Sequence, residues 1–252
     1  YHVTQDQQYE TLIQETISFI NQNLFEEKRL LARYREGKSH YLGYLDDYAF
    51  YVYGLIESYQ STFNPDYLKQ AIGLTQEMIR LFKDGEAGGY YLYGSDAEHL
   101  MIRPKETYDG AMPSGNSVAA YNLIRLARLT GDATLEKEAM EQLNFMAAHA
   151  THYEISHAFY LIAAQFALES SKELIAILTN DNEIEDFKTF LSLSPLFNLT
   201  VILKTPENEN KLSDLIPFLT DYPLSKDPSF YVCEGGSCHA PVHTLGDLKQ
   251  FI

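Results

Sequence analysis

The strongest constraint in this sequence is an internal repeat of two predicted helical hairpins. Seven residues of segment 53–78 return in segment 121–146 at a constant offset of 68 positions. Asn64 and Asp132 stand at the same offset, where each can cap a helix. Repeated hairpins bury their apolar faces against one another, as in solenoids and α/α toroids. Chance similarity between two amphipathic helices is the alternative. The matched residues are Tyr53, Leu55, Ile56, Thr62, Lys69, Ala71 and Met78 in the first copy and Tyr121, Leu123, Ile124, Thr130, Lys137, Ala139 and Met146 in the second.

Further predicted elements surround the repeat. Residues 5–25 carry apolar side chains at helical spacing, and a looser third unit begins at Tyr153. Between the copies, glycines at 85, 88 and 89 interrupt the helical pattern. Residues 90–93 and 100–103 then resemble the arms of a β-hairpin around 94–96. The expected fold is mainly α, with a β-hairpin insertion.

The pattern changes after residue 170. Short apolar runs at 174–178, 198–203 and 230–232 predict strands, and 182–190 and 211–219 predict helices. Strands that alternate with helices indicate a small α/β unit with some parallel pairing. We therefore expect a helical-hairpin domain over 1–170 and a small α/β subdomain over 171–252 packed on it.

Charge and hydropathy exclude several classes of partner. The 252 residues hold 35 Asp and Glu against 19 Lys and Arg, a formal charge of −16. The electrostatic field of a chain with this negative charge repels phosphate backbones and anionic lipids, so we expect neither nucleic acid nor a membrane as partner. No apolar run is long enough to span a bilayer, and no basic signal peptide pattern is present. We predict a cytoplasmic protein, and the absence of an initial Met favours a fragment.

Acidic, hydroxyl and aromatic residues gather at the predicted helix starts. If the hairpins pack in parallel register, these starts share one rim, a geometry that suits a small-molecule site. Glycoside chemistry needs two carboxyl groups about 5–10 Å apart, and sugar binding needs aromatic faces. We predict Asp47, Asp109 and Glu106 as catalytic carboxylates, with Tyr48 and Tyr108 as stacking platforms and Asn116 as an orienting group. The predicted ligand-binding residues are Asp46, Tyr48, Arg103, Tyr108, Ser114, Asn116 and His157.

Each of these residues also has a purely structural interpretation. An Asp at a helix start caps free amides, and Asp109-Gly110 is an ordinary turn sequence. Arg103 could form a structural ion pair with Glu106 or Asp109.

A second cluster contains Cys233, Cys238, His239 and His243. Two thiols and two imidazoles within eleven residues could bind zinc. They could equally form a disulfide across Gly235-Gly236, or serve only packing. We predict no metal ion and no cofactor.

Three motifs resemble the YyaL family, which includes the spermatogenesis-associated thioredoxin-like proteins. They are Leu45-Asp-Asp-Tyr-Ala49, the segment from Arg103 to Ser117, and Tyr231-Val-Cys with Cys238 and Pro241. The resemblance covers essentially the whole chain. It implies the C-terminal portion of an (α/α)6 toroid of the six-hairpin glycosidase and N-acylglucosamine epimerase type. It also implies an N-terminal thioredoxin-like domain, absent from this chain, as a partner. It brings no established reaction.

Two main hypotheses follow. The rim could bind or process a carbohydrate-like ligand through its carboxylates. Alternatively, the repeats form a non-catalytic scaffold for a thioredoxin-like domain or a protein partner. A toroid needs about twelve helices, so a partial one leaves apolar surface through which we expect a homodimer. A third hypothesis places zinc or redox chemistry at the Cys/His segment.

Overall fold

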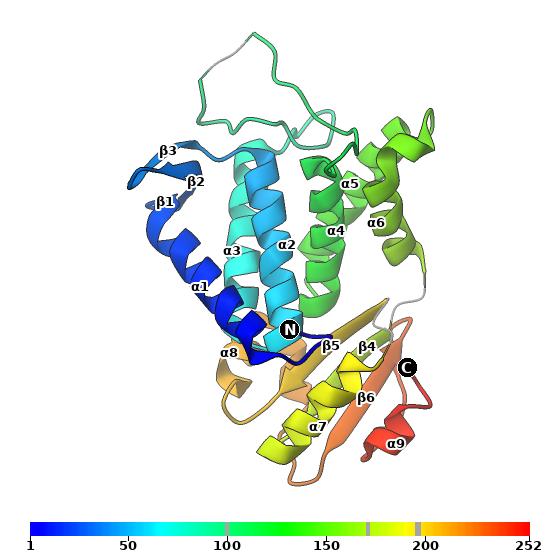
Figure 1. Cartoon of the computed structure of the whole chain (residues 1–252). Helices are drawn as coiled ribbons and strands as arrows, with labels where there is room; N and C mark the ends of the chain where they lie inside the picture. Colours follow the sequence, from blue (N-terminus) through cyan, green and yellow to red (C-terminus); the bar gives the residue numbers. More distant parts are fainter. Residues whose placement is uncertain (99–100, 170–171, 195–197) are drawn as a thin grey trace.

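A computed structural model describes residues 1–98, 101–169, 172–194 and 198–252, and it shows a helical part above a small α/β part (Figure 1). The helical part contains α1 (Gln7–Asn23), α2 (Leu45–Thr62), α3 (Pro65–Phe82), α4 (Gly115–Thr130), α5 (Ala133–Ala150) and α6 (Ala158–Leu168), with a short 3-10 turn at Glu154–His157. A small sheet, β1 (Phe25–Glu26), β2 (Arg29–Arg35) and β3 (Lys38–Leu42), lies between α1 and α2.

The two hairpins α2–α3 and α4–α5 have the same local construction, which confirms the repeat. Phe63 and Gly131, 68 positions apart, both end a helix in the left-handed conformation, with φ of 58° and 67°. The next residue, Asn64 or Asp132, caps the following helix: its side chain accepts a hydrogen bond from a backbone N–H two residues on. Each hairpin therefore turns through the same sequence of conformations.

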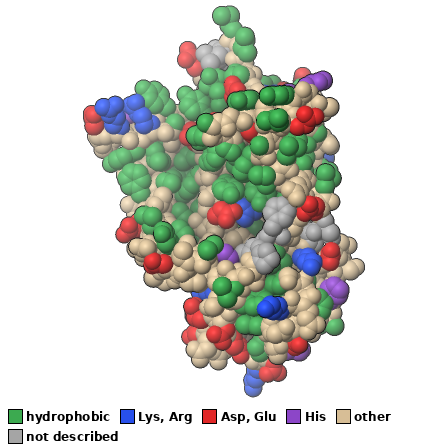
Figure 2. Space-filling model, turned by 45° about the vertical axis from the view of Figure 1, so that its right-hand side comes forward, with side chains coloured by type: hydrophobic (Ala, Val, Ile, Leu, Met, Phe, Trp, Pro, Cys, Tyr) green, Lys and Arg blue, Asp and Glu red, His purple; other side chains and the backbone are tan. Residues whose placement is uncertain are grey.

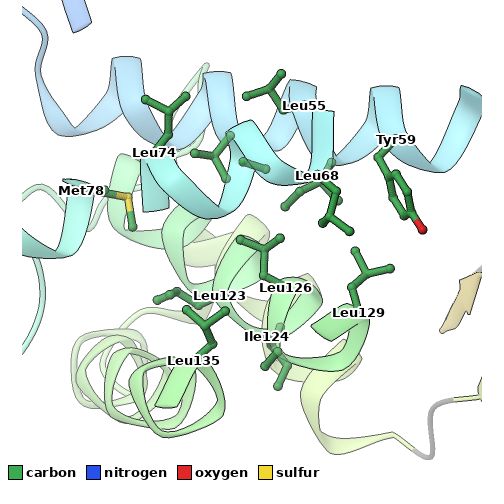
Figure 3. Packing of buried hydrophobic residues seen from close by; sticks show 14 of the residues in the cluster. Leu55, Tyr59, Leu68, Leu74, Met78, Leu123, Ile124, Leu126, Leu129 and Leu135 are labelled. Carbon is green, nitrogen blue, oxygen red and sulfur yellow. The ribbon is translucent and has the colours of Figure 1, made fainter. Parts of the chain in front are cut away.

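The hairpins pack as two layers. Helices α2, α4 and α6 lie side by side as an inner row, with α3 behind α2 and α5 behind α4 (Figure 1). Leu55 and Leu68 of the first hairpin and Leu126 of the second belong to one buried cluster, and all three are fully buried (Figure 3). Burying such a side chain contributes about 1.5–3 kcal/mol. The packing of one hairpin on the next is thus a continuous apolar core.

The predicted β-hairpin at 90–103 is wrong in position. The described residues of that segment form turns and extended chain, while Leu100 lies outside the described residues. One backbone hydrogen bond, from the Leu92 N–H to the Pro104 carbonyl at 2.8 Å, links the two sides of the segment, and the Arg103 guanidinium lies 3.9 Å from the Tyr91 ring centre. The structure places an antiparallel hairpin at β2–β3, where Arg33 pairs with His40. The sequence did not predict this hairpin, because it is largely exposed and its charged residues interrupt the alternation of apolar and polar side chains.

The C-terminal part is a mixed sheet in the order β5-β4-β6-β7, from β4 (Lys172–Ile177), β5 (Leu199–Lys204), β6 (Ser229–Glu234) and β7 (Ser237–Cys238). Strands β4 and β5 are parallel, as predicted, and β6 runs antiparallel to β4. Side chains alternate along β4: Leu174 and Ala176 face α7 (Asp181–Ser192) and α9 (Leu245–Leu248), whereas Ile175 and Ile177 join the core of the helical part.

One predicted helix of this part is shorter than expected. Helix α8 (Glu209–Leu215) stops before Pro217, which opens a 3-10 turn over Pro217–Asp221. Proline disfavours helical backbone in the residue before it, so the helix cannot run to Leu219.

The two parts are in direct contact. The Gln60 side chain of α2 donates to the carbonyl of Val201 on β5 at 2.9 Å and accepts from the N–H of Val201 at 3.3 Å. The predicted domain boundary between 170 and 171 lies outside the described residues. Within the described ranges, no helix combines the length and apolar character needed to cross a bilayer.

Candidate functional site

The starts of the three inner helices meet at one rim, where carboxylates bind them together. Asp46 lies in the first turn of α2, and its Oδ1 accepts a hydrogen bond from the N–H of Gly115, the first residue of α4, at 3.0 Å. Glycine is required at 115 because a Cβ there would collide with the Asp46 carboxylate. The rim that the repeat predicts is therefore present between α2 and α4.

Asp109 connects α4 to α6 in the same way. Its Oδ1 accepts from the Ser114 N–H at 2.8 Å, and its Oδ2 accepts from the N–H groups of Phe159 and Tyr160 at 2.9 and 3.1 Å. The residue is only 9% exposed. Two helix N-termini direct free amides at this carboxylate, which is the environment that stabilises a negative charge. Both oxygens accept hydrogen bonds from the protein, which gives Asp109 a structural role at the two helix starts, while its predicted catalytic role stays a prediction.

Asp47 also bonds to backbone. Its Oδ2 accepts from the N–H of Tyr44, the residue before α2, at 2.7 Å. Burial raises the pKa of this carboxyl, and this hydrogen bond and the nearby Arg29 charge partly oppose the rise. The structure thus places Asp47 in a helix-capping role, the structural alternative for this position.

Asp46, like Asp47, is half-buried, and Glu106 is exposed. Burial raises the pKa of Asp46; the Gly115 N–H opposes this, and the negative charges of Asp47 and Glu106 raise it further. The Glu106 carboxylate forms no hydrogen bond with the residues that the structure describes. The arrangement brings one half-buried and one exposed carboxyl group together at the mouth of the α2–α4 junction.

Tyr48 and Asn116 are fully buried, and their side chains bond to the protein, so nothing in the described residues supports the ligand contacts predicted for them. The Tyr48 hydroxyl accepts from the Leu30 N–H at 3.0 Å, and its side chain is fully buried. The Asn116 amide bonds to both the N–H and the carbonyl of Tyr90, and its nitrogen donates to the carbonyl of Glu106 at 2.8 Å. Asn116 therefore anchors the insertion 83–112 to α4.

Ser114 and His157 are buried as well, and the structure gives each a local partner. The Ser114 hydroxyl accepts from the Ser117 N–H and caps α4. The Nδ1 of His157 lies 2.9 Å from the Ser156 hydroxyl and 3.1 Å from the Tyr153 carbonyl. Its Nε2 is buried without a hydrogen-bond partner in the described part of the chain. Neither side chain faces solvent, against their predicted ligand contacts.

Arg103 and Tyr108 are exposed. Arg103 donates to the carbonyl of Tyr93 at 3.0 Å and stacks on Tyr91. No carboxylate of the described residues forms an ion pair with Arg103, so the predicted pairing with Glu106 or Asp109 is wrong. Tyr108 is 64% exposed and remains free to stack on a ligand.

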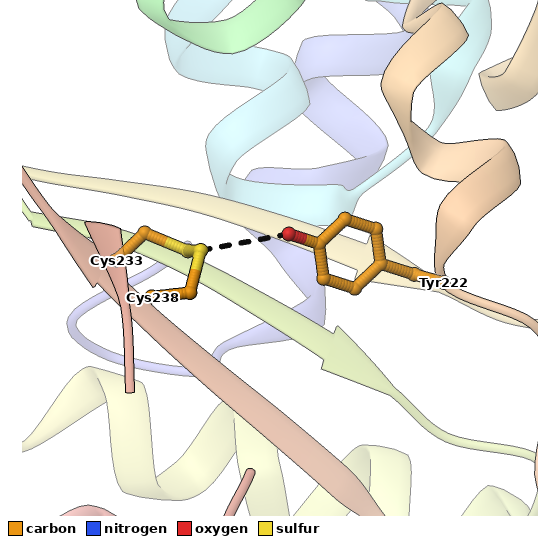
Figure 4. Close-up of a disulfide and its surroundings, with 3 residues drawn as sticks. All are labelled: Tyr222, Cys233 and Cys238. Atoms are coloured by element: carbon orange, nitrogen blue, oxygen red, sulfur yellow. Dashed lines mark hydrogen bonds between the residues drawn. A yellow bond between two sulfur atoms is a disulfide. The ribbon is translucent and has the colours of Figure 1, made fainter. Parts of the chain in front are cut away.

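Cys233 and Cys238 form a disulfide, one of the three alternatives for these residues. It closes the turn of Gly235 and Gly236, both at positive φ, and the Tyr222 hydroxyl donates to the Cys238 Sγ at 3.6 Å (Figure 4). The neighbouring imidazoles have other contacts: His239 packs on Phe251, and His243 lies 2.7 Å from the Pro228 carbonyl. In the residues that the structure describes, no group of three or more His, Cys, Asp or Glu side chains is arranged to hold a metal ion.

Sequence reasoning missed the residues that position the rim. Arg29 pairs with Asp96 at 2.9 Å and Lys105 with Asp84 at 2.7 Å, which fixes both sides of the insertion. Gln142 of α5 donates to the Asn116 Oδ1 at 3.1 Å. Helical spacing could have found Gln142, because it shares the buried face of Leu135, Ala139 and Met146. The two ion pairs join residues far apart in sequence, and no local signal identifies them.

The fold and the rim define a helical-hairpin repeat protein with an appended α/β unit. The chain is similar to spermatogenesis-associated protein 20: it is 29% identical to the human protein over 217 residues, 83% of this chain and 27% of the relative. The rat protein gives the same identity and coverage, and an uncharacterized Caenorhabditis elegans protein is 26% identical over 230 residues, 85% of this chain and 29% of the relative.

These relatives support the family that the sequence motifs indicate, and the chain spans about a quarter of their length. No family model matches the sequence.

Proposed function

We propose that this chain is a scaffold segment of an α/α toroid within a longer protein. The observation that supports this most is the bonding of Asp109, whose two carboxylate oxygens accept three backbone amides from the starts of α4 and α6. A carboxylate held in this way stabilises the junction of two helices, and three of its roughly four acceptor positions are taken by backbone amides. Asp46 makes the equivalent link between α2 and α4.

The layered arrangement supports the toroid in this proposal. An inner row of parallel helices backed by outer helices is the pattern from which closed rings of hairpins are built. The edge formed by α6, which Figure 2 turns towards the viewer, exposes Leu161, Ile162 and Leu168 at 43, 41 and 83%. Apolar side chains at an open edge suit a further hairpin of the longer protein or a second copy of the chain.

The partner that the family resemblance suggests is a thioredoxin-like domain, and the proposed scaffold would hold it. A cytoplasmic location remains part of the proposal. Alkylation of thiols in intact cells before lysis would test it together with the redox state of Cys233 and Cys238.

The scaffold role is tested with Asp109→Asn. The amide keeps one acceptor oxygen but places an NH₂ group against backbone donors, so we expect a lower urea midpoint and faster hydrogen exchange at Phe159 and Tyr160. Glu106→Gln is the matched control, because that exposed side chain lies on the same insertion. An unchanged midpoint and unchanged exchange for Asp109→Asn would contradict the scaffold role of Asp109.

A second candidate function is carbohydrate binding at the rim. The raised pKa of Asp46, with Glu106 as a neighbouring carboxylate, favours an acid and base pair, and the exposed Tyr108 ring offers a stacking face. This keeps Glu106 as a catalytic carboxylate, as first predicted, and puts Asp46 in the place of Asp47 and Asp109.

This candidate is tested by calorimetric titration of mono- and oligosaccharides into the wild-type chain and into Asp46→Asn with Glu106→Gln. We expect saturable binding that the double variant weakens at least tenfold, with Glu86→Gln on an exposed loop as control. Equal binding by wild type and double variant, or no binding by either, would argue against a sugar site here.

A further inference from the structure

A cleft of about 570 Å³ lies at the seam between the helical part and the α/β unit, away from the rim. Ile124, Ala127 and Met140 contribute its helical side, and Phe218, Tyr222 and Cys233 its other side. We propose that this cleft binds an amphipathic monocarboxylate, with an apolar body between the two parts and its carboxylate on Arg128. The proposal is independent of the function assigned to the rim.

Arg128 lines the cleft and is short of hydrogen-bond acceptors. Its Nη2 donates to the Ala167 carbonyl at 3.3 Å, and its guanidinium lies 4.2 Å from the Phe166 ring centre. Its Nη1 is buried and has no hydrogen-bond partner in the part of the chain that the structure describes. No carboxylate in the described ranges comes within ion-pair distance of it.

The charge of Arg128 is therefore poorly compensated. Burial lowers the pKa of Arg128, and the Glu173 and Glu136 charges oppose this only through space. A half-buried guanidinium with a buried, unpartnered N–H group is unfavourable. A carboxylate supplies two acceptors in the planar geometry that arginine matches. The arrangement thus favours a ligand with one anionic, planar group.

The remaining walls favour an apolar ligand body. The cleft volume falls in the range of about 300–1,000 Å³ that is usual for small-molecule sites, which also concentrate where two structural units meet. Met140 is 43% exposed, so an adaptable apolar side chain at the cleft is not covered by the protein itself. A hydrocarbon chain or ring would bury this surface.

The acidic residues at the cleft select for a single negative charge. Glu136, Glu169 and Glu173 lie around the same hollow as Arg128. A phosphate or dicarboxylate would bring a second charge towards these residues, whereas a monocarboxylate needs only the guanidinium.

The disulfide hairpin supplies one rigid wall. Cys233, Gly235 and Gly236 line the cleft, and the bridge to Cys238 together with the Tyr222 hydroxyl holds the hairpin in place (Figure 4). Because this hairpin is already held in place, less conformational entropy is lost when a ligand binds.

The experiment is a calorimetric titration of the chain with decanoate, with decylammonium and decan-1-ol as probes of equal length. We expect decanoate to bind at one site and decylammonium to bind at least tenfold more weakly. Arg128→Gln should weaken decanoate binding at least tenfold. Arg125→Gln should leave it within twofold, because Arg125 lies on the same helix but pairs with Glu57 away from the cleft.

A second variant distinguishes a loss of ligand binding from a loss of folding. Met140→Glu places a carboxylate at an exposed position of the cleft, so the fold should survive while decanoate binding falls at least tenfold. Equal binding of decanoate and decylammonium, or unchanged decanoate binding by both variants, would overturn the proposal. Reduced sugar binding at the rim has no bearing on either outcome.

Discussion

The hairpins α2–α3 and α4–α5 reach one backbone conformation by two different means. At the turn, the first uses Phe63 and the second uses Gly131, both at positive φ. Glycine adopts this conformation freely, whereas a bulky residue does so only when its surroundings compensate. The Phe63 ring is buried and packs against Tyr59 and against Phe187 of α7. The difference teaches that tertiary packing can replace intrinsic backbone preference at an equivalent site.

Each turn also holds the α/β unit differently. Phe63 inserts its own ring into the core around α7. Gly131 instead makes room, because a Cβ there would lie 3.0 Å from the Phe218 ring. The turn of the first hairpin thus inserts the Phe63 ring into the α/β unit, whereas the turn of the second hairpin leaves space at Gly131 for the Phe218 ring.

The largest difference between the copies should appear at Asp109. The position 68 residues earlier is the exposed Tyr41, so the first hairpin has no such carboxylate. Asp109→Ala leaves three amides at two helix starts without acceptors, and we expect it to lower the free energy of unfolding by about 4 kcal/mol. Urea denaturation measures this, with Tyr41→Ala expected to be nearly neutral. Equal losses of unfolding free energy for the two variants would show that Asp109 stabilises its hairpin no more than Tyr41 stabilises the other.

The second largest effect on stability is expected at the hairpin turns, at Phe63 and Gly131. Phe63→Gly removes a buried ring but relieves the left-handed strain, so we expect a net loss of about 3 kcal/mol. Gly131→Ala introduces that strain and a close contact with Phe218, for a loss of about 1–2 kcal/mol. Denaturation midpoints of both variants test the comparison. A stabilised Phe63→Gly protein would mean that packing does not hold this turn.

The helix caps should be equivalent. Asn64→Ala and Asp132→Ala each remove one side-chain acceptor at the start of an outer helix, and we expect each to lower the free energy of unfolding by about 1 kcal/mol. Thermal unfolding of the two variants and of their combination measures this. A twofold difference between the two losses would show that the hairpins differ at their caps as well as at their turns.

The smallest effect is the pH dependence at the α2–α4 link. Burial raises the pKa of Asp46 above its ordinary value of 3.8, so the folded chain binds this proton more tightly than the unfolded chain does. Its contribution to stability is therefore greatest below pH 3.8 and declines as the pH rises through the folded pKa. Asp46→Asn keeps an oxygen for the Gly115 N–H and does not titrate.

Urea midpoints of wild type and Asp46→Asn at pH 4 and pH 7 test this. The variant should gain stability relative to wild type between these values, while Asp47 titrates in both proteins and cancels. A constant difference at the two pH values would show that Asp46 is as well solvated as a free side chain.

Much of the fold followed from local pattern. The repeat predicted both hairpins and their caps, since capping joins residues only two positions apart. The strands at 172–177, 199–204 and 229–234 also follow from short apolar runs. The hairpin β2–β3 did not, because its exposed charged residues carry no alternating apolar pattern.

The sequence predicted where the helix starts meet better than it predicted which side chains there are exposed. The sequence placed Asp46, Asp109 and the helix starts at one rim, and they lie there. It assigned ligand contacts to Tyr48, Asn116 and His157, all of which are buried. Residue type and spacing do not distinguish an acid that faces solvent from one that faces a helix start.

The sequence by itself determined the helical hairpins, their caps and the strand-forming runs, because these depend on contacts within a few residues. Only the tertiary structure decided which carboxylates remain accessible and that Arg128 lines a cleft with its Nη1 unpartnered among the described residues. Two of the three amide hydrogen bonds that Asp109 accepts come from Phe159 and Tyr160, 50 and 51 residues further along the chain. Burial and hydrogen bonding at such distances depend on how the helices pack.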